Sequence, residues 1–100
     1  MTDTTDRENL ELAAKAAGYW NYTYNCYEGK MSWNPRDDDG DAFRLAVDLK
    51  IELMVTDQCA NACFNMVVYS EPLTTGDTYA ATRRAIVRVA AAIGRGMKND

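Results

Sequence analysis

The chain has 100 residues, 47% of them hydrophobic and 26% charged, with 15 acidic and 11 basic side chains and no histidine. These values predict one folded domain over residues 1–100 and exclude a disordered or low-complexity chain. Without imidazole, catalysis by a Ser-His-Asp or Cys-His pair is excluded, and zinc loses its commonest ligand. No stretch is apolar enough to span a membrane and the N-terminus is polar and acidic, which predicts a cytoplasmic protein.

The first predicted element is a helix over about residues 5–17. Thr5 and Glu8 have the spacing of a capping box, which satisfies peptide N–H groups at a helix start. The apolar residues that follow repeat at helical spacing. Gly18 comes where a left-handed residue commonly ends a helix.

An aromatic segment follows this helix. Residues 19–27 alternate with the period of a strand, and residues 31–33 supply a short return strand, so a hairpin is predicted. One face of this hairpin must be core, while aromatic side chains on the other face suit a protein interface. The segment carries six of the ten aromatic residues, namely Tyr19, Trp20, Tyr22, Tyr24, Tyr27 and Trp33.

A second helix is predicted after the acidic run at residues 37–39, because carboxylates favour the positive end of the helix dipole. Its apolar positions are Ala42, Phe43, Ala46, Val47 and Leu49. Two β-rich stretches, residues 51–55 and 63–69, then predict a second hairpin with a loop of about 5–7 residues.

The last helix is the best-defined predicted element. Thr78 is its expected cap, and the pair Gly94 and Gly96 predicts fraying near its end. Its apolar stripe consists of Ile86, Val89, Ala90, Ile93 and Met97. The whole order is α-β-β-α-β-β-α, which predicts an α+β fold with a mostly antiparallel four-stranded sheet covered by three helices in a sandwich-like arrangement.

The acidic cluster Asp37, Asp38, Asp39 and Asp41 does not have EF-hand spacing. It reads as helix capping with added solubility, or as a surface that binds basic groups of a partner. A Mg²⁺ site on Asp38 and Asp41, which an enzyme would need, is a weaker third interpretation.

A basic face lies on the last helix. Arg84, Arg88 and Arg95 are spaced at i, i+4 and i+11, so they fall on one side of the helix, opposite the apolar stripe. Such a stripe can contact nucleic-acid phosphates, or it can pair with the protein's own acids. From Thr78 onward the chain carries five basic residues and one acid, Asp100.

The three cysteines, Cys26, Cys59 and Cys63, suit a reducing compartment, and Cys59 and Cys63 form a CxxxC pair. A metal site would need a further pair of ligands. We expect reduced, partly buried thiols.

Three segments, residues 11–18, 33–49 and 81–88, together resemble small proteins of tailed phages and prophages that are grouped as the phage ABA-sandwich domain family. The most specific part is the run Trp33-Asn34-Pro35-Arg36-Asp37-Asp38-Asp39-Gly40-Asp41-Ala42, which leads into the second helix. The resemblance implies a helix–sheet–helix sandwich and a phage origin, and it implies no catalytic residues.

We therefore expect a non-enzymatic phage or prophage accessory protein that binds a host protein in the bacterial cytoplasm, for example as an anti-CRISPR inhibitor of a defence system. No cofactor, metal ion or membrane is expected. The alternative is a nucleic-acid-binding accessory protein that uses Arg84, Arg88 and Arg95, and a homodimer through an exposed sheet face stays open. The expected partner-binding residues are Asp37, Asp38, Asp39, Asp41, Tyr19, Tyr27 and Trp33.

Overall fold

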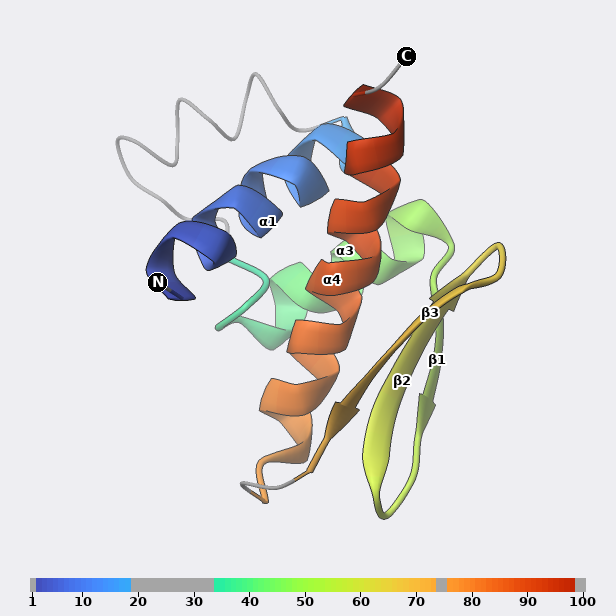
Figure 1. Ribbon diagram of the computed structural model, residues 1–100. Helices are drawn as coiled ribbons and strands as arrows, with labels where there is room; N and C mark the ends of the chain where they lie inside the picture. The colour runs from blue at the N-terminus through green and yellow to red at the C-terminus, as the bar shows by residue number, and fades with distance from the viewer. Residues whose placement is uncertain (1, 19–33, 74–75, 99–100) are drawn as a thin grey trace.

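The computed structural model describes residues 2–18, 34–73 and 76–98 (Figure 1). Its elements, in chain order, are α1 (Thr2–Ala17), α3 (Asp39–Leu49), β1 (Glu52–Val55), β2 (Cys59–Phe64), β3 (Val67–Pro72) and α4 (Thr78–Lys98). The predicted α+β class is confirmed. The predicted aromatic hairpin, with Tyr19, Tyr27 and Trp33, lies outside the described residues.

The sheet of the described part has three antiparallel strands in the order β1-β2-β3, so the fourth predicted strand is not shown. The single hairpin predicted between residues 51–55 and 63–69 is wrong, because that part of the chain forms a meander with two tight turns. β2 is the central strand and begins at Cys59, inside the stretch predicted as a loop. Its Ala62 pairs with Leu53 on one side and with Tyr69 on the other.

The second tight turn interrupts the stretch that was predicted as one strand. Asn65 and Met66 both have positive φ, at 49° and 78°, and they join β2 to β3. Two consecutive left-handed residues match the type I′ turn, whose twist suits a hairpin of adjacent strands. Asparagine tolerates this conformation, whereas methionine is strained in it.

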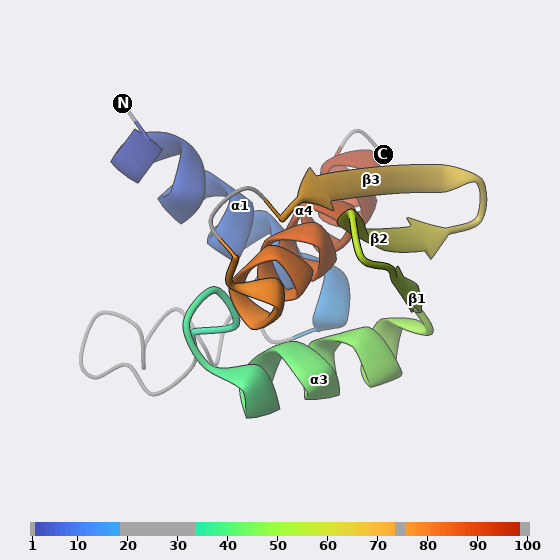
Figure 2. The same cartoon turned by 90° about the horizontal axis from the view of Figure 1, so that it is seen from below.

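Helix α4 lies at the centre of the molecule, with the sheet on one side and α1 and α3 on other sides of it (Figure 2). It packs directly on β2 and β3, while α1 and α3 pack mainly against α4. The sheet presents small side chains to this helix, since Ala60 and Ala62 of β2 are fully buried. Among the described helices, α4 is the one that covers the sheet, through its contacts with β2 and β3.

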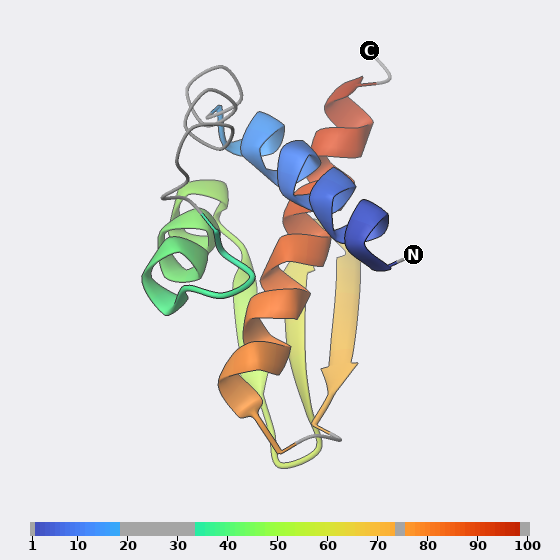
Figure 3. The same cartoon turned by 90° about the vertical axis from the view of Figure 1, so that its left-hand side faces the viewer.

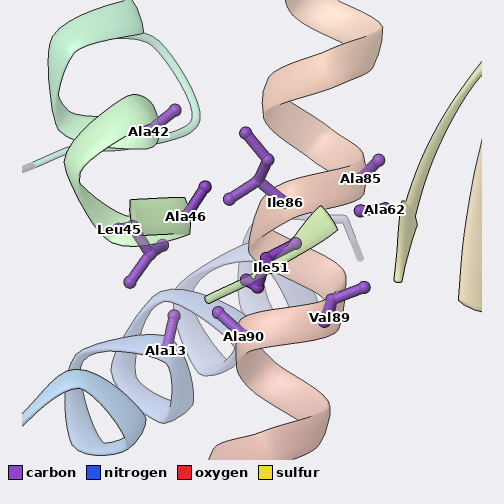
Figure 4. Close-up of a cluster of buried hydrophobic side chains, with 10 residues drawn as sticks. All are labelled: Ala13, Ala42, Leu45, Ala46, Ile51, Ala62, Ala85, Ile86, Val89 and Ala90. Atoms are coloured by element: carbon purple, nitrogen blue, oxygen red, sulfur yellow. The ribbon is translucent and has the colours of Figure 1, made fainter. Parts of the chain in front are cut away.

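The core is built mainly from small side chains, with Leu45 and Val89 among its largest fully buried members (Figure 4). The predicted stripe of α4 is confirmed at Ile86, Val89 and Ala90, which are all buried. The stripe predicted for α3 is wrong in part. Phe43 and Val47 are exposed, and the buried positions of α3 are Asp41, Ala42, Leu45 and Ala46.

Helices α1 and α4 cross closely (Figure 3). At the crossing, Gly94 is buried, and a Cβ atom added to it would lie 2.0 Å from the carbonyl oxygen of Leu12. The predicted fraying at Gly94 and Gly96 is wrong, because α4 continues to Lys98. Gly94 allows the two helices to approach.

The helix ends differ in part from the predicted ones. α1 begins at Thr2, so Thr5 lies inside the helix and the predicted capping box is wrong, whereas Gly18 has the expected left-handed φ of 82°. α4 is capped by Asp77, whose Oδ1 accepts a hydrogen bond from the Ala80 N–H at 3.0 Å, and not by Thr78. In the described part of the chain, every helix is too short or too polar to cross a bilayer.

Candidate functional site

The acidic cluster forms the start of α3. Asp38 is the N-cap, with extended φ and ψ, and its Oδ2 accepts from the Asp41 N–H at 2.8 Å. Asp41 is buried, and its carboxylate accepts from the Asn34 N–H and from Arg44 Nη2, both at 2.8 Å. These two aspartates therefore build the turn that precedes α3, which is the capping role that the sequence also allowed.

The other two aspartates present their carboxylates at the surface. Asp37 is exposed and accepts from Asn34 Nδ2 at 3.1 Å. Asp39 forms an ion pair with Arg83 Nη1 at 2.5 Å, and Arg83 Nε donates to the Arg36 carbonyl at 2.7 Å. Among the residues that the structure describes, no three carboxylate or thiol side chains are grouped as metal ligands.

An apolar groove lies beside this cluster, between α3, β1 and the first turns of α4, with a volume of about 590 Å³. Its exposed aromatic side chains are Phe43 and Tyr79, which are 65% and 71% accessible to solvent. Leu53 and Val55 of β1 form its strand side. Large exposed apolar side chains gathered in one place are unusual on a protein without a partner. The remaining lining residues are Asp39, Ala42, Thr78, Thr82, Arg83 and Ile86.

The strand side of this groove is an open sheet edge. β1 pairs with β2 alone among the described strands. The Thr56 N–H donates to the Cys59 carbonyl at 2.9 Å, so Thr56 belongs to a hydrogen-bonded pair across the turn. Because such pairs alternate along an antiparallel ladder, the peptide groups of Leu53 and Val55 point away from β2. The same two residues thus direct backbone groups outward and side chains into the groove.

The rim of the groove carries acidic residues. Asp39 lines it, and the exposed Asp77 directly precedes Thr78 of the lining. The positive charge of Arg83, which also lines the groove, is balanced by its ion pair with Asp39. Basic residues of a bound segment would be placed beside these exposed carboxylates.

A second, polar pocket of about 410 Å³ lies on another face of α4. The structure brings the three arginines predicted for the basic face, Arg84, Arg88 and Arg95, into this pocket and adds Arg36 from the turn before α3. The other lining residues are Asn9, Tyr69, Glu71 and Val87. We call this the arginine pocket; four arginines and one glutamate line it.

Glu71 orients two of these arginines. Its side chain is 12% exposed, and it accepts from Arg84 Nε at 3.3 Å and from Arg88 Nη1 at 2.6 Å. The Arg88 guanidinium also lies 4.6 Å from the centre of the Tyr69 ring, within the range of a cation–π contact. The arginines are thus held in place by β3 instead of projecting in a row from α4.

Sequence reasoning missed several of these residues. Tyr79 follows Thr78, the predicted helix cap, and no periodic pattern distinguishes it. Phe43 was expected in the core. Glu71 lies beyond the stretch 63–69 that was predicted as a strand, although it is the inward-facing partner of Ala60 in the sheet. Only the alternation of inward and outward side chains along β3 could have placed Glu71 in the sheet. That alternation could not be recognised, because the turn at residues 65–66 was not predicted.

The cysteines do not form a metal site within the described residues. Cys59 and Cys63 are free thiols on β2, four residues apart on one strand. Four residues of strand separate their Cα atoms by about 13 Å, too far for one metal ion or a disulfide. Cys26 lies outside the described residues.

Comparison of the chain with protein-family models, with curated proteins and with solved structures finds no match. The resemblance to the phage ABA-sandwich domain family stays a prediction.

Proposed function

We propose that this chain is a non-enzymatic binding domain that takes an extended, basic segment of another protein along the open edge of β1. The observation that carries the proposal is the position of Leu53 and Val55, which turn outward peptide groups that no described strand pairs, and direct their side chains into the apolar groove. A peptide strand added to such an edge gains main-chain hydrogen bonds, and its alternate side chains enter the groove.

The chemistry of the surroundings supports this occupant. Phe43 and Tyr79 stand at the groove as exposed aromatic side chains, the type that often dominates binding energy at interfaces. The acidic rim supports basic residues in the bound segment. Asp39, one of the predicted contact residues, lines the groove where α3 begins, while Asp38 and Asp41 support that helix start.

The resemblance to phage proteins supports a bacterial host protein as the source of the segment. Holding a segment of a host component along β1 is a direct way for a small domain to inhibit a defence complex, because binding needs no catalytic group. A standard interface of about 800 Å² per partner is within reach of a domain of this size.

Selection from a displayed library of random peptides on the immobilised protein tests the proposal. The expected peptides alternate apolar residues with others and carry Lys or Arg at their flanks. Phe43→Ala and Tyr79→Ala should each weaken a selected peptide about tenfold or more, as interface aromatic residues do. Met66→Ala is the matched control, since Met66 is 91% exposed at the far turn of the sheet, and it should leave binding unchanged.

A separate variant tests whether the peptide binds as an added strand along β1. Val55→Pro removes an outward N–H and no ladder hydrogen bond, so the domain should fold while peptide binding is lost. In hydrogen exchange, the Leu53 and Val55 amides should become protected on binding. Peptides that bind all variants equally would contradict the proposal. So would a concentration-dependent dimer that protects these same amides without peptide, because a second copy would then be the occupant.

A further inference from the structure

We infer that the arginine pocket binds a phosphate group of charge near −2, as in a phosphomonoester or the end of a polyphosphate. This site is separate from the apolar groove, because the two are lined by different faces of α4. The inference rests on three arginines of α4, Arg84, Arg88 and Arg95, that line one cavity together with the carboxylate residue Glu71.

Among the described residues that line the pocket, Glu71 is the one acid beside the three arginines of α4. Glu71 is shared by Arg84 and Arg88, and each of these arginines contacts Glu71 through one nitrogen. A guanidinium has five N–H donors in a planar fork, so most donors of this pair are not directed at Glu71. Arg95 lines the same pocket and has no carboxylate partner among the described residues.

The geometry favours phosphate over other anions. Arginine forks match the oxygen arrangement of a phosphate, and several arginines on one group are typical of sites that take a dianion. Glu71 and the Tyr69 ring hold Arg84 and Arg88 before a ligand arrives, which lowers the entropy cost of binding. The volume of about 410 Å³ is in the range of small-ligand pockets.

The same features argue against a track for a nucleic-acid backbone. A track needs charges that project in a row, whereas Arg84 and Arg88 are turned toward Glu71 on β3. The phosphate could still belong to a free nucleotide or to the terminal phosphate of a strand, since both offer the same group to the pocket.

Calorimetric titration with inorganic pyrophosphate, adenosine triphosphate, and a short single-stranded DNA with or without a 5′-phosphate tests the inference. Pyrophosphate is expected to bind at concentrations below about 1 mM, the weak end of specific affinity. Binding by the triphosphate as well assigns a free nucleotide as the source, and preference for the 5′-phosphorylated strand assigns a strand end. DNA that binds equally well without the 5′-phosphate, while pyrophosphate does not bind, would overturn the inference in favour of a backbone track.

Three variants distinguish binding in the pocket from attraction to the overall charge of the protein. Arg95→Gln should weaken pyrophosphate about tenfold, as expected for loss of a charge-assisted hydrogen bond. Lys50→Gln removes the same charge from an exposed position outside the pocket and should leave the affinity unchanged. Arg88→Lys keeps the charge but loses the fork, so it should weaken binding severalfold. Equal weakening by Arg95→Gln and Lys50→Gln, or no effect of Arg88→Lys, would overturn the inference; circular dichroism confirms that each variant is folded.

Discussion

The substitution Gly94→Ala tests the crossing of α1 and α4. The added Cβ would lie 2.0 Å from the Leu12 carbonyl oxygen and 2.8 Å from its carbonyl carbon, where ordinary contact begins at 3.4 Å. The helices would have to separate by about 1.4 Å, and such a gap removes much of the dispersion attraction of the side chains around it. Because the obstacle is backbone, no rotation of a side chain relieves it.

The expected magnitude is the difference of two effects. Alanine is favoured over glycine inside a helix by about 1 kcal/mol, whereas overpacking costs about 3 kcal/mol at the upper end of its usual range. We therefore expect Gly94→Ala to lower the free energy of unfolding by about 2 kcal/mol. For a domain of this size, that loss lowers the melting temperature by about 8–16 °C.

The matched control is Gly96→Ala, two residues along the same helix. A Cβ at Gly96 meets nothing within 4 Å, so this change should raise stability by a few tenths to about 1 kcal/mol. Urea unfolding of the two variants and the parent chain measures the expected loss of stability and the expected gain in one experiment. If Gly94→Ala also raises stability, α1 and α4 do not cross at this residue and the reasoning fails.

Three further substitutions have expected outcomes in the same unfolding assay. Asp38→Ala should cost about 1 kcal/mol because it removes the α3 N-cap, while Asp37→Ala should stay within about 0.5 kcal/mol; equal effects would contradict the capping role. Met66→Gly should gain about 0.5–1 kcal/mol by relieving a left-handed methionine, and a loss would contradict the type I′ turn. Glu71→Gln should lower the free energy of unfolding by about 1 kcal/mol, a modest loss because the arginine partners of Glu71 are partly solvated. No change would show that these ion pairs do not hold β3 to α4.

The helices were predictable because their signals are local, yet the buried face of α3 was not. Ala42 and Ala46 lie in both the predicted and the observed stripe, with Phe43 and Val47 on one side of them and Leu45 on the other. Both sides are apolar, and periodicity does not tell which side another element covers. The structure resolves this by placing Leu45 in the core and leaving Phe43 at the groove.

The meander was missed for a different reason. The stretch from Cys63 to Tyr69 reads as one β-rich run, since Met66 is not a residue that favours a turn. The turn forms there because pairing of β3 with β2 outweighs the local preference of methionine. Without that turn the inward position of Glu71 was not visible.

The candidate sites, too, were predictable only where they depend on local sequence spacing. The spacing of Arg84, Arg88 and Arg95 predicted one basic face, and the structure confirms that the three residues share a surface. Their contact with Glu71 and the addition of Arg36 depend on tertiary packing. The open edge of β1 depends on which strands pair, and that is a property of the assembled sheet.

The central position of α4 has a consequence for how the domain comes to be folded. α1, α3 and the sheet all pack on this helix, which is the last of these elements in the chain. Its contacts with α1 join residues about 80 positions apart. Closing so long a loop costs conformational entropy, so these contacts form slowly during folding. A nascent chain that ends before Thr78 lacks the partner for each of its apolar faces. Folding must therefore wait until α4 has been synthesised, and until then the apolar faces of α1, α3 and the sheet stay open to chaperones and to aggregation.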